Sequence, residues 1–151
     1  MSQQIVADSN IFIAAVLQET YTKQADDLIR YWAQQHIHIA APTLFRYEVA
    51  AVIRKHVYRR TLTTERAAQV RTALETLVSG ITFMIDTDLL ERGYELATRF
   101  NLPTAYDAQY LAVAERLGVE FWTADERLFN VVGKELNWIR WLGHFAPVNL
   151  E

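Results

Sequence analysis

The chain has 151 residues, no cysteine and a formal net charge of −3. This length fits one domain with a full hydrophobic core, so we expect residues 1–151 to form a single domain. The missing cysteines exclude disulfides and thiolate metal sites, and the acidic balance excludes nucleic-acid binding through overall charge alone. No signal peptide or membrane-spanning run of about 18 apolar residues is apparent, so we expect a cytoplasmic protein that has no contact with membranes.

The first half of the chain alternates between predicted strands and helices. Residues 4–8 form a short apolar run that predicts a buried strand ending at Asp8. Residues 9–19 and 22–35 predict two helices, and residues 37–41 predict the next strand. We expect Pro42 to open a long helix over residues 43–60, because proline fits the first turn of a helix.

The second half continues this alternation. A helix over residues 63–80 begins with Thr/Glu capping chemistry and ends at Gly80. A strand over 81–85 and a helix over 86–101, capped by Asp86 or Asp88, come next, and the segment 101–119 holds a helix that ends at Gly118. Residues 119–125, 126–135 and 136–142 predict a strand, a short helix and a last strand.

This order predicts an α/β protein, with a three-layer α/β/α arrangement in which helices cover both faces of a mainly parallel sheet. The helices predicted over residues 43–60 and 63–80 follow one another with no strand between them. We therefore expect them to form a helical hairpin insertion that protrudes from the sheet.

Four acidic residues fall where they could meet. Asp8 and Asp125 each end a predicted strand, and ligands of parallel α/β sheets bind beyond the carboxyl ends of the strands. Asp107 lies in the first turn of its helix, in register with the residues that should face the core. Glu48 borders the apolar face of its own helix. These acids could converge at one end of the sheet.

Each acid also has a purely structural interpretation. Asp8 and Asp125 could cap the helices that follow them, and Asp107 could form a capping box with Thr104. Glu48 could pair with Arg54 or Lys55 later in its helix, or simply be solvated. Carboxylates that crowd together, however, repel and desolvate one another, so they persist only when protonated or with a cation between them. The natural cation for an all-oxygen site is Mg²⁺ or Mn²⁺.

A carboxylate site of this kind suits hydrolysis of phosphodiesters. A divalent ion can bind a phosphate oxygen, lower the pKa of a bound water and stabilise the leaving oxygen. Ser9, Asn10 and Thr123 lie beside the acids and could hydrogen-bond the carboxylates or metal-bound waters. The alternative for these three residues is ordinary turn and cap chemistry.

Other polar and aromatic residues give weaker signals. Four cations lie on and just beyond the end of a predicted helix, which favours cations anyway, but they are also candidates for contact with RNA phosphates: Arg54, Lys55, Arg59 and Arg60. His36 and His38 share a strand face, but no third ligand follows at zinc-site spacing. We expect the four tryptophans to lie in the core or at an interface rather than to stack on bases.

Four segments together resemble the PIN-domain family, most closely its VapC-like ribonuclease toxins: VADSNIFIA, YEVAAV, LPTAYDAQYLAVAE and FWTADERLF. The resemblance covers nearly the whole chain. It implies a compact α/β/α fold, often dimeric, whose acidic pocket binds one or two divalent ions and cleaves single-stranded RNA. Carried over by motif, the catalytic and metal-binding acids are Asp8, Glu48, Asp107 and Asp125. The toxins also have a partner antitoxin protein that blocks the pocket.

The leading hypothesis is therefore an Mg²⁺- or Mn²⁺-dependent endoribonuclease, acting on single-stranded or structured RNA as the toxin of a toxin–antitoxin pair. Two alternatives stay open, namely an RNA-processing nuclease without an antitoxin and an RNA-binding or interaction module that does not cleave. A phosphotransferase that uses Asp8 as its nucleophile is disfavoured, because Asn10 stands where such enzymes need a second acid.

Overall fold

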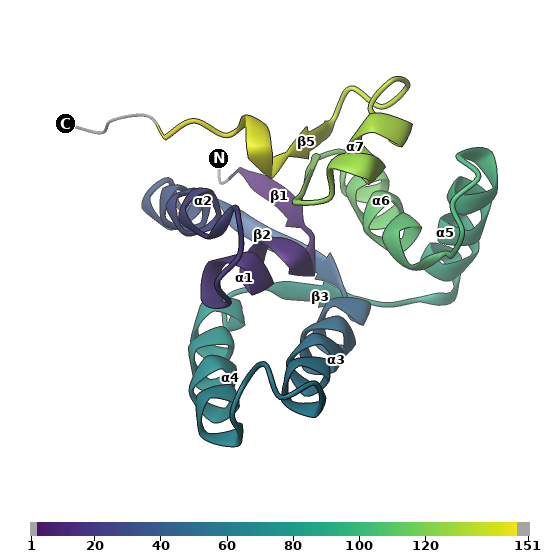
Figure 1. The fold of residues 1–151 in the computed structure, drawn as a ribbon. Helices are drawn as coiled ribbons and strands as arrows, with labels where there is room; N and C mark the ends of the chain where they lie inside the picture. The colour runs from purple at the N-terminus through teal and green to yellow at the C-terminus, as the bar shows by residue number, and fades with distance from the viewer. Residues whose placement is uncertain (1–2, 148–151) are drawn as a thin grey trace.

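A five-stranded, entirely parallel sheet lies at the centre of the computed structural model, which describes residues 3–147 (Figure 1). Its strands are β1 (Gln4–Ala7), β2 (His38–Pro42), β3 (Thr82–Met84), β4 (Glu120–Thr123) and β5 (Ile139–Trp141). They lie in the order β3-β2-β1-β4-β5, and each neighbouring pair is parallel. The order turns around at β1, so β2 and β4 flank it on opposite sides.

Helices cover both faces of this sheet, which confirms the predicted three-layer α/β/α fold. They are α1 (Ser9–Val16), α2 (Thr22–Gln34), α3 (Leu44–Tyr58), α4 (Thr64–Val78), α5 (Thr87–Arg99), α6 (Tyr106–Leu117) and α7 (Glu126–Val132), followed by a 3-10 turn at Leu142–His144. Helices α1 and α2 pack on one face, and α5 and α6 pack as a pair on the other (Figure 1). Within residues 3–147, no helix is both long and apolar enough to cross a bilayer.

Helix α6 carries Asp107 in its first turn and packs the rest of its length against the core. It contacts β1, β2 and β4, and residues 110–114 of the helix are buried without interruption. The helix ends as predicted at Gly118, whose φ of 66° lies in the left-handed region that glycine adopts without steric strain. The buried apolar run thus fixes the position of the first turn of α6 against the sheet.

Several predicted boundaries are wrong: the helix expected over residues 9–19 ends at Val16, the one expected over 126–135 ends at Val132, and the strand expected over 136–142 begins at Ile139. Two others have a clear physical reason. Pro42 does not open a helix but is the last residue of β2, beyond the part of that strand that pairs with β1, where its missing N–H breaks no bond to that neighbour. Helix α4 ends at Val78 rather than at Gly80. Its cap is Thr63, whose hydroxyl accepts from the backbone N–H of Arg66, so the expected pairing with a glutamate does not form.

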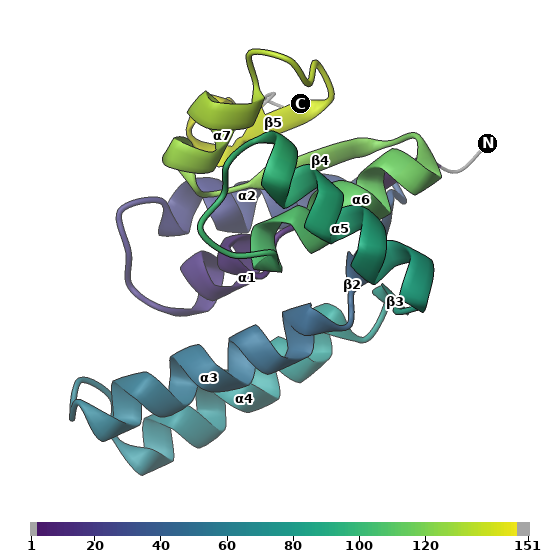
Figure 2. The ribbon, with the colours of Figure 1, turned by 90° about the vertical axis from the view of Figure 1, so that its right-hand side faces the viewer.

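Helices α3 and α4 form the predicted hairpin, which extends away from the sheet (Figure 2). Ile53 of α3 and Val70 and Leu74 of α4 are buried, whereas most other residues of the two helices are exposed. The start of α3 and the body of α4 contact α1. The hairpin therefore rests on the body at one end and presents its connecting turn to solvent.

Candidate active site

The strand register brings Asp8 and Thr123 together at the carboxyl edge of the sheet. Ala7 pairs with Trp122, so the next residues of β1 and β4 face each other. The Thr123 hydroxyl donates to Oδ2 of Asp8 at 2.9 Å, and Oδ1 of Asp8 accepts from the backbone N–H of Asn10 at 3.3 Å. Asp8 is 4% exposed and caps α1, so its capping interpretation is confirmed and is compatible with a role in the candidate site through its second oxygen.

Asn10 links the start of α1 to the loop after β4. Its Nδ2 donates to the Thr123 hydroxyl at 3.3 Å, and its Oδ1 accepts from the backbone N–H of Ala124 at 2.9 Å. The backbone N–H of Asp125 donates to the same hydroxyl at 3.0 Å. Thr123 therefore uses its one proton toward Asp8 and accepts twice, which fixes its orientation.

Glu48 projects from α3 into a separate set of hydrogen bonds. Its Oε1 accepts from the Tyr110 hydroxyl at 2.5 Å and from the Ser9 hydroxyl at 3.2 Å. The Ser9 hydroxyl lies 3.5 Å from Oδ1 of Asp8, so serine stands between the two carboxylates. Glu48 forms no ion pair with the cations later in its helix, so that structural alternative is wrong. It is half-buried and bonded to two protein hydroxyls, so it is not simply solvated either.

Tyr110 is the functional candidate that sequence reasoning missed. Its ring is fully buried and stacks on Phe121, with 5.6 Å between ring centroids, so its apolar character assigned it to the core. Its hydroxyl nevertheless reaches Glu48 and accepts from the Ser9 N–H at 3.4 Å. Its place three residues after Asp107, on the same face of α6, was the available signal.

Asp107 and Asp125 come from two further elements, and we call the set of Asp8, Glu48, Asp107 and Asp125 the acidic group. Helix α6 begins after Ala105 without a side-chain cap bond, so the capping box proposed for Asp107 and Thr104 does not form. Asp125 does cap α7, because its Oδ1 accepts from the backbone N–H of Leu128 at 3.1 Å. The capping interpretation therefore holds for Asp125 and fails for Asp107.

The acids interact strongly enough to change one another's protonation. Burial raises the pKa of Asp8 to about 8, and the negative charges of Glu48 and Asp107 add to this rise. Burial likewise raises the pKa of Asp107, with further contributions from Asp125 and Glu48. Burial also raises the pKa of Tyr110 well above its usual value, so its hydroxyl keeps its proton and acts as a donor to Glu48.

This donor set has the chemistry that a hard divalent cation needs. It offers anionic oxygens from β1, α3, α6 and the β4–α7 loop, which no cation of residues 3–147 neutralises. Within the same residues, however, no three histidine or acidic side chains already form a cluster that could hold a metal ion. The carboxylates would therefore have to rearrange on binding, and the hydroxyl groups of Ser9 and Thr123 are placed to guide them.

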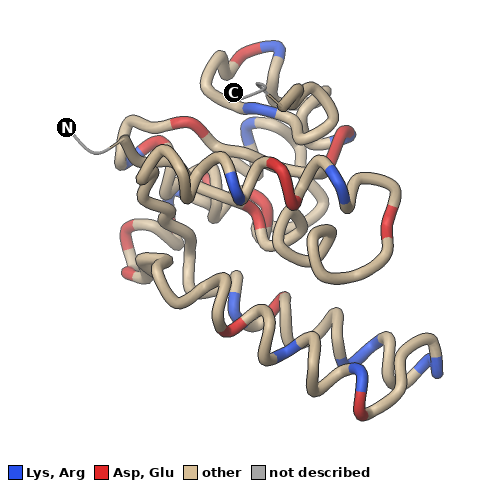
Figure 3. The backbone as a smooth tube through the Cα atoms, turned by 90° about the vertical axis from the view of Figure 1, so that its left-hand side faces the viewer, with Lys and Arg blue, Asp and Glu red and all other residues tan. Residues whose placement is uncertain are grey.

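The remaining candidates lie outside this acidic group. Arg54, Lys55, Arg59 and Arg60 are exposed near the turn of the α3–α4 hairpin, where Figure 3 shows Lys and Arg gathered. His36 and His38 are exposed and belong to no cluster of metal ligands within the described part of the chain. The tryptophans are buried or half-buried, as expected for core residues.

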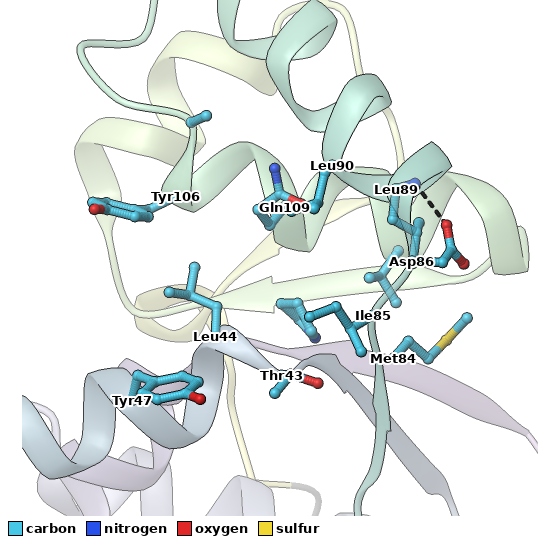
Figure 4. A pocket seen from close by; sticks show the side chains of 13 residues that line it. Thr43, Leu44, Tyr47, Met84, Ile85, Asp86, Leu89, Leu90, Tyr106 and Gln109 are labelled. Carbon is cyan, nitrogen blue, oxygen red and sulfur yellow. Dashed lines mark hydrogen bonds between the residues drawn. The ribbon is translucent and has the colours of Figure 1, made fainter.

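A separate apolar groove of about 330 Å³ lies beside the acidic group, between the start of α3, the end of β3 and helices α5 and α6 (Figure 4). Its lining includes Tyr47, Ile85, Leu90 and Tyr106, which are 52% to 72% exposed. Tyr47 and Tyr106 directly precede Glu48 and Asp107 in the chain. Most of the lining of this groove is apolar, although Thr43, Asp86 and Gln109 also border it.

Comparison with known proteins agrees with this geometry, since the sequence model of the PIN domain matches residues 5–135. The chain belongs to the PIN-domain family. Ribonuclease VapC9 of Mycobacterium tuberculosis is 38% identical over 125 residues, which are 82% of this chain and 87% of that protein. Ribonuclease VapC3 of Pyrobaculum aerophilum is 27% identical over 126 residues, covering 83% and 92% of the two chains.

The PIN fold is also found among solved structures. A toxin–antitoxin complex from Klebsiella pneumoniae contains a chain that superimposes with a TM-score of 0.65 at 20% identity, over 91% of this chain and 97% of that chain. The architecture is thus retained at a low level of sequence identity. The four segments that suggested the family from sequence all lie inside the matched residues 5–135.

Proposed function

We propose that this PIN-domain protein is a ribonuclease that depends on a divalent metal ion, Mg²⁺ or Mn²⁺, and hydrolyses phosphodiester bonds within RNA. The observation that carries the proposal is the convergence of Asp8, Glu48 and Asp107 without a cation to neutralise them; burial raises the pKa of both aspartates, and the neighbouring negative charges raise it further. The VapC ribonucleases it resembles support the same reaction. Because the proposed substrate is cellular RNA, we also propose that the protein acts in the cytoplasm.

Each side chain has a distinct part in this proposal. Asp8, Glu48 and Asp107 would hold one or two ions, and Asp125 would contribute its charge from the cap of α7. When bound, the ion would supply a water of lowered pKa and stabilise the leaving oxygen. Tyr110 and Ser9 hold Glu48, Thr123 holds Asp8, and Asn10 holds Thr123, so these hydrogen bonds orient two of the four carboxylates before an ion binds.

The test is cleavage of single-stranded and of structured RNA by the purified protein in Mg²⁺, in Mn²⁺ and in EDTA. We expect cleavage only with a divalent ion and a loss of cleavage in Asp8→Asn and Asp107→Asn. Equal cleavage by these variants would contradict the proposal. RNA binding without cleavage would favour the alternative of a non-cleaving RNA-binding module.

An antitoxin is the proposed protein partner, supported by the Klebsiella pneumoniae toxin–antitoxin complex that shares this fold. Co-expression with a small neighbouring gene should give a complex that copurifies and suppresses cleavage. If no neighbouring gene encodes such a protein, an RNA-processing nuclease with the same chemistry becomes the better description.

We further propose that two copies of the chain pair through the apolar groove. Five of the exposed large hydrophobic side chains lie in it or one turn away: Tyr47, Ile85, Leu90, Tyr94 and Tyr106. At 150–250 Å² for a whole aromatic side chain they expose on the order of 700 Å², close to the ~800 Å² that each partner buries in a standard interface. Light scattering should give the mass of a dimer, and Ile85→Asp with Leu90→Asp should give a monomer.

A further inference from the structure

The α3–α4 hairpin differs from the rest of the chain in how its cations are used. Residues 44–78 carry seven Lys and Arg but only three acids, although the whole chain is acidic. Outside the hairpin, six of the eight Lys and Arg form ion pairs with acids: Lys23, Arg30, Arg92, Arg99, Arg116 and Arg140. Within residues 3–147, no cation of the hairpin forms one. The hairpin is therefore a local positive surface on an acidic protein.

Tyr58 lies within this positive surface. At 77% exposed it is the most exposed of the large hydrophobic side chains in the described part of the chain. Arg54 and Lys55 precede it by four and three residues on α3, so both are its neighbours on the helix surface, and Arg59 follows it. No arginine lies over its ring, because the cation–π contacts within residues 3–147 involve only Arg46 and Arg99. At this exposure, and with no arginine over it, the ring is accessible to a partner.

The chemistry of this surface favours one kind of partner. A polyanion with exposed planar groups can pair its charges with the cations and stack a planar group on the ring. Single-stranded RNA is such a molecule. A duplex keeps its bases stacked inside. A second copy of the chain docked symmetrically here would bring the unpaired cations of both copies together, which is unfavourable.

We propose that Tyr58 is a base-stacking residue for single-stranded RNA, with Arg54 and Lys55 binding the phosphates on either side of the stacked base. The inference rests on the proposed function, because it assigns part of the path of the same substrate. Tyr58 lies ten residues after Glu48 on one helix, or about 15 Å along its axis. About four stacked nucleotides span that length. The hairpin thus holds the strand a fixed number of nucleotides from the acidic group.

The experiment measures binding separately from cleavage. Fluorescence anisotropy with a labelled 12-nucleotide single-stranded RNA, in EDTA, gives the Kd of the full chain and of its variants. Tyr58→Ala should raise Kd at least about fivefold, and Tyr58→Phe should restore it to within about twofold, because the phenylalanine ring still stacks. Arg54→Gln should weaken binding and reduce the dependence of log K on log salt by about one ion.

Two controls make the result specific. Val131→Ala removes an exposed apolar side chain, 47% exposed, from α7, outside both the hairpin and the apolar groove, and it should leave RNA affinity unchanged. The affinity for a blunt RNA duplex should not respond to Tyr58→Ala. The inference is overturned if Tyr58→Ala binds like the wild type, if Tyr58→Phe fails to restore binding, or if Tyr58→Ala changes the mass in light scattering instead. If Tyr58→Ala weakens RNA binding as expected but the wild type cleaves no RNA, only the proposed function is contradicted.

Discussion

The carboxylates of the α5–α6 surface and those of the acidic group are held in opposite ways. On α5 and α6, Arg116 binds Asp86, and Arg92 binds Glu115 at 2.7 Å and 3.0 Å, so these arginines lower the pKa of both acids. In the acidic group, burial and neighbouring acids raise the pKa of Asp8 and Asp107. Asp86 and Glu115 each have a cation of their own, whereas the grouped acids have only one another. The comparison supports the proposal that the acidic group binds a cation from outside the chain.

The strongest way to test this difference is to neutralise one grouped acid. Asp107→Asn should reduce RNA cleavage by at least about 100-fold, because changes one shell further out already cost 10- to 100-fold at metal sites. The same variant should unfold at an unchanged or higher temperature without metal, since it removes repulsion. Cleavage assays and thermal unfolding measure the two effects. A large loss of thermal stability would assign Asp107 a structural role instead.

Removing the Tyr110 hydroxyl should have an intermediate effect. Tyr110→Phe keeps the buried ring but deprives Glu48 of its shortest hydrogen bond. We expect cleavage to fall about tenfold and the free energy of unfolding to fall by about 1–3 kcal/mol, as is usual when a donor to a charged group is lost. Tyr106→Phe is the matched control on the same helix, with an exposed ring, and should retain wild-type cleavage. Equal effects of both variants would contradict the special role of Tyr110.

The pH dependence of stability should also separate the two regions. Asp8 has a pKa of about 8 in the folded chain and 3.8 as a free side chain. Between these values the folded state binds more protons than the unfolded state, so the metal-free protein should lose stability as pH rises, by at most about 1.4 kcal/mol per pH unit from this residue. Denaturant unfolding from pH 4.5 to 8 tests this, and Asp8→Asn should flatten the slope. A stability that rises over this range in the wild type, unaltered in Asp8→Asn, would be the opposite result.

The smallest effect on stability and cleavage is expected from breaking the ion pair between Arg92 and Glu115 on the α5–α6 surface. Glu115→Gln breaks the bond to Arg92 but leaves the acidic group untouched. Since the pair is exposed, the free energy of unfolding should fall by less than about 1 kcal/mol, and cleavage should not change. Unfolding and cleavage of this variant are measured beside those of Asp107→Asn. A loss of cleavage in Glu115→Gln would remove the distinction between the two regions.

Most of the fold and part of the candidate site could be predicted from the sequence. Alternating short strands and helices predicted the parallel sheet and the protruding hairpin, because hydrophobic periodicity reflects which faces are buried. Pro42 was misplaced, because proline is compatible both with the first turn of a helix and with the end of a strand. Such a boundary depends on the neighbouring strand, which a local pattern does not contain.

The site was predictable where chain topology alone sets a position. Asp8 directly follows β1 and Thr123 ends β4, and these strands are parallel neighbours, so the contact between the two residues follows from strand direction. The bond between Tyr110 on α6 and Glu48 on α3 joins residues 62 positions apart, and no local pattern encodes it. Such a role is hard to predict for a tyrosine, because its ring packs in the core while its hydroxyl hydrogen-bonds to a residue of the site.

The most direct test of the central claim is calorimetric titration of Mn²⁺ into the metal-free protein at pH 7.5. We predict binding that releases protons, since Asp8 is largely protonated near its pKa of about 8, and the measured heat should therefore depend on the ionisation enthalpy of the buffer. Asp8→Asn and Asp107→Asn should bind far more weakly, and Glu115→Gln should bind like the wild type. An absence of binding, or equal binding by all four proteins, would contradict the claim that the grouped carboxylates form a cation site.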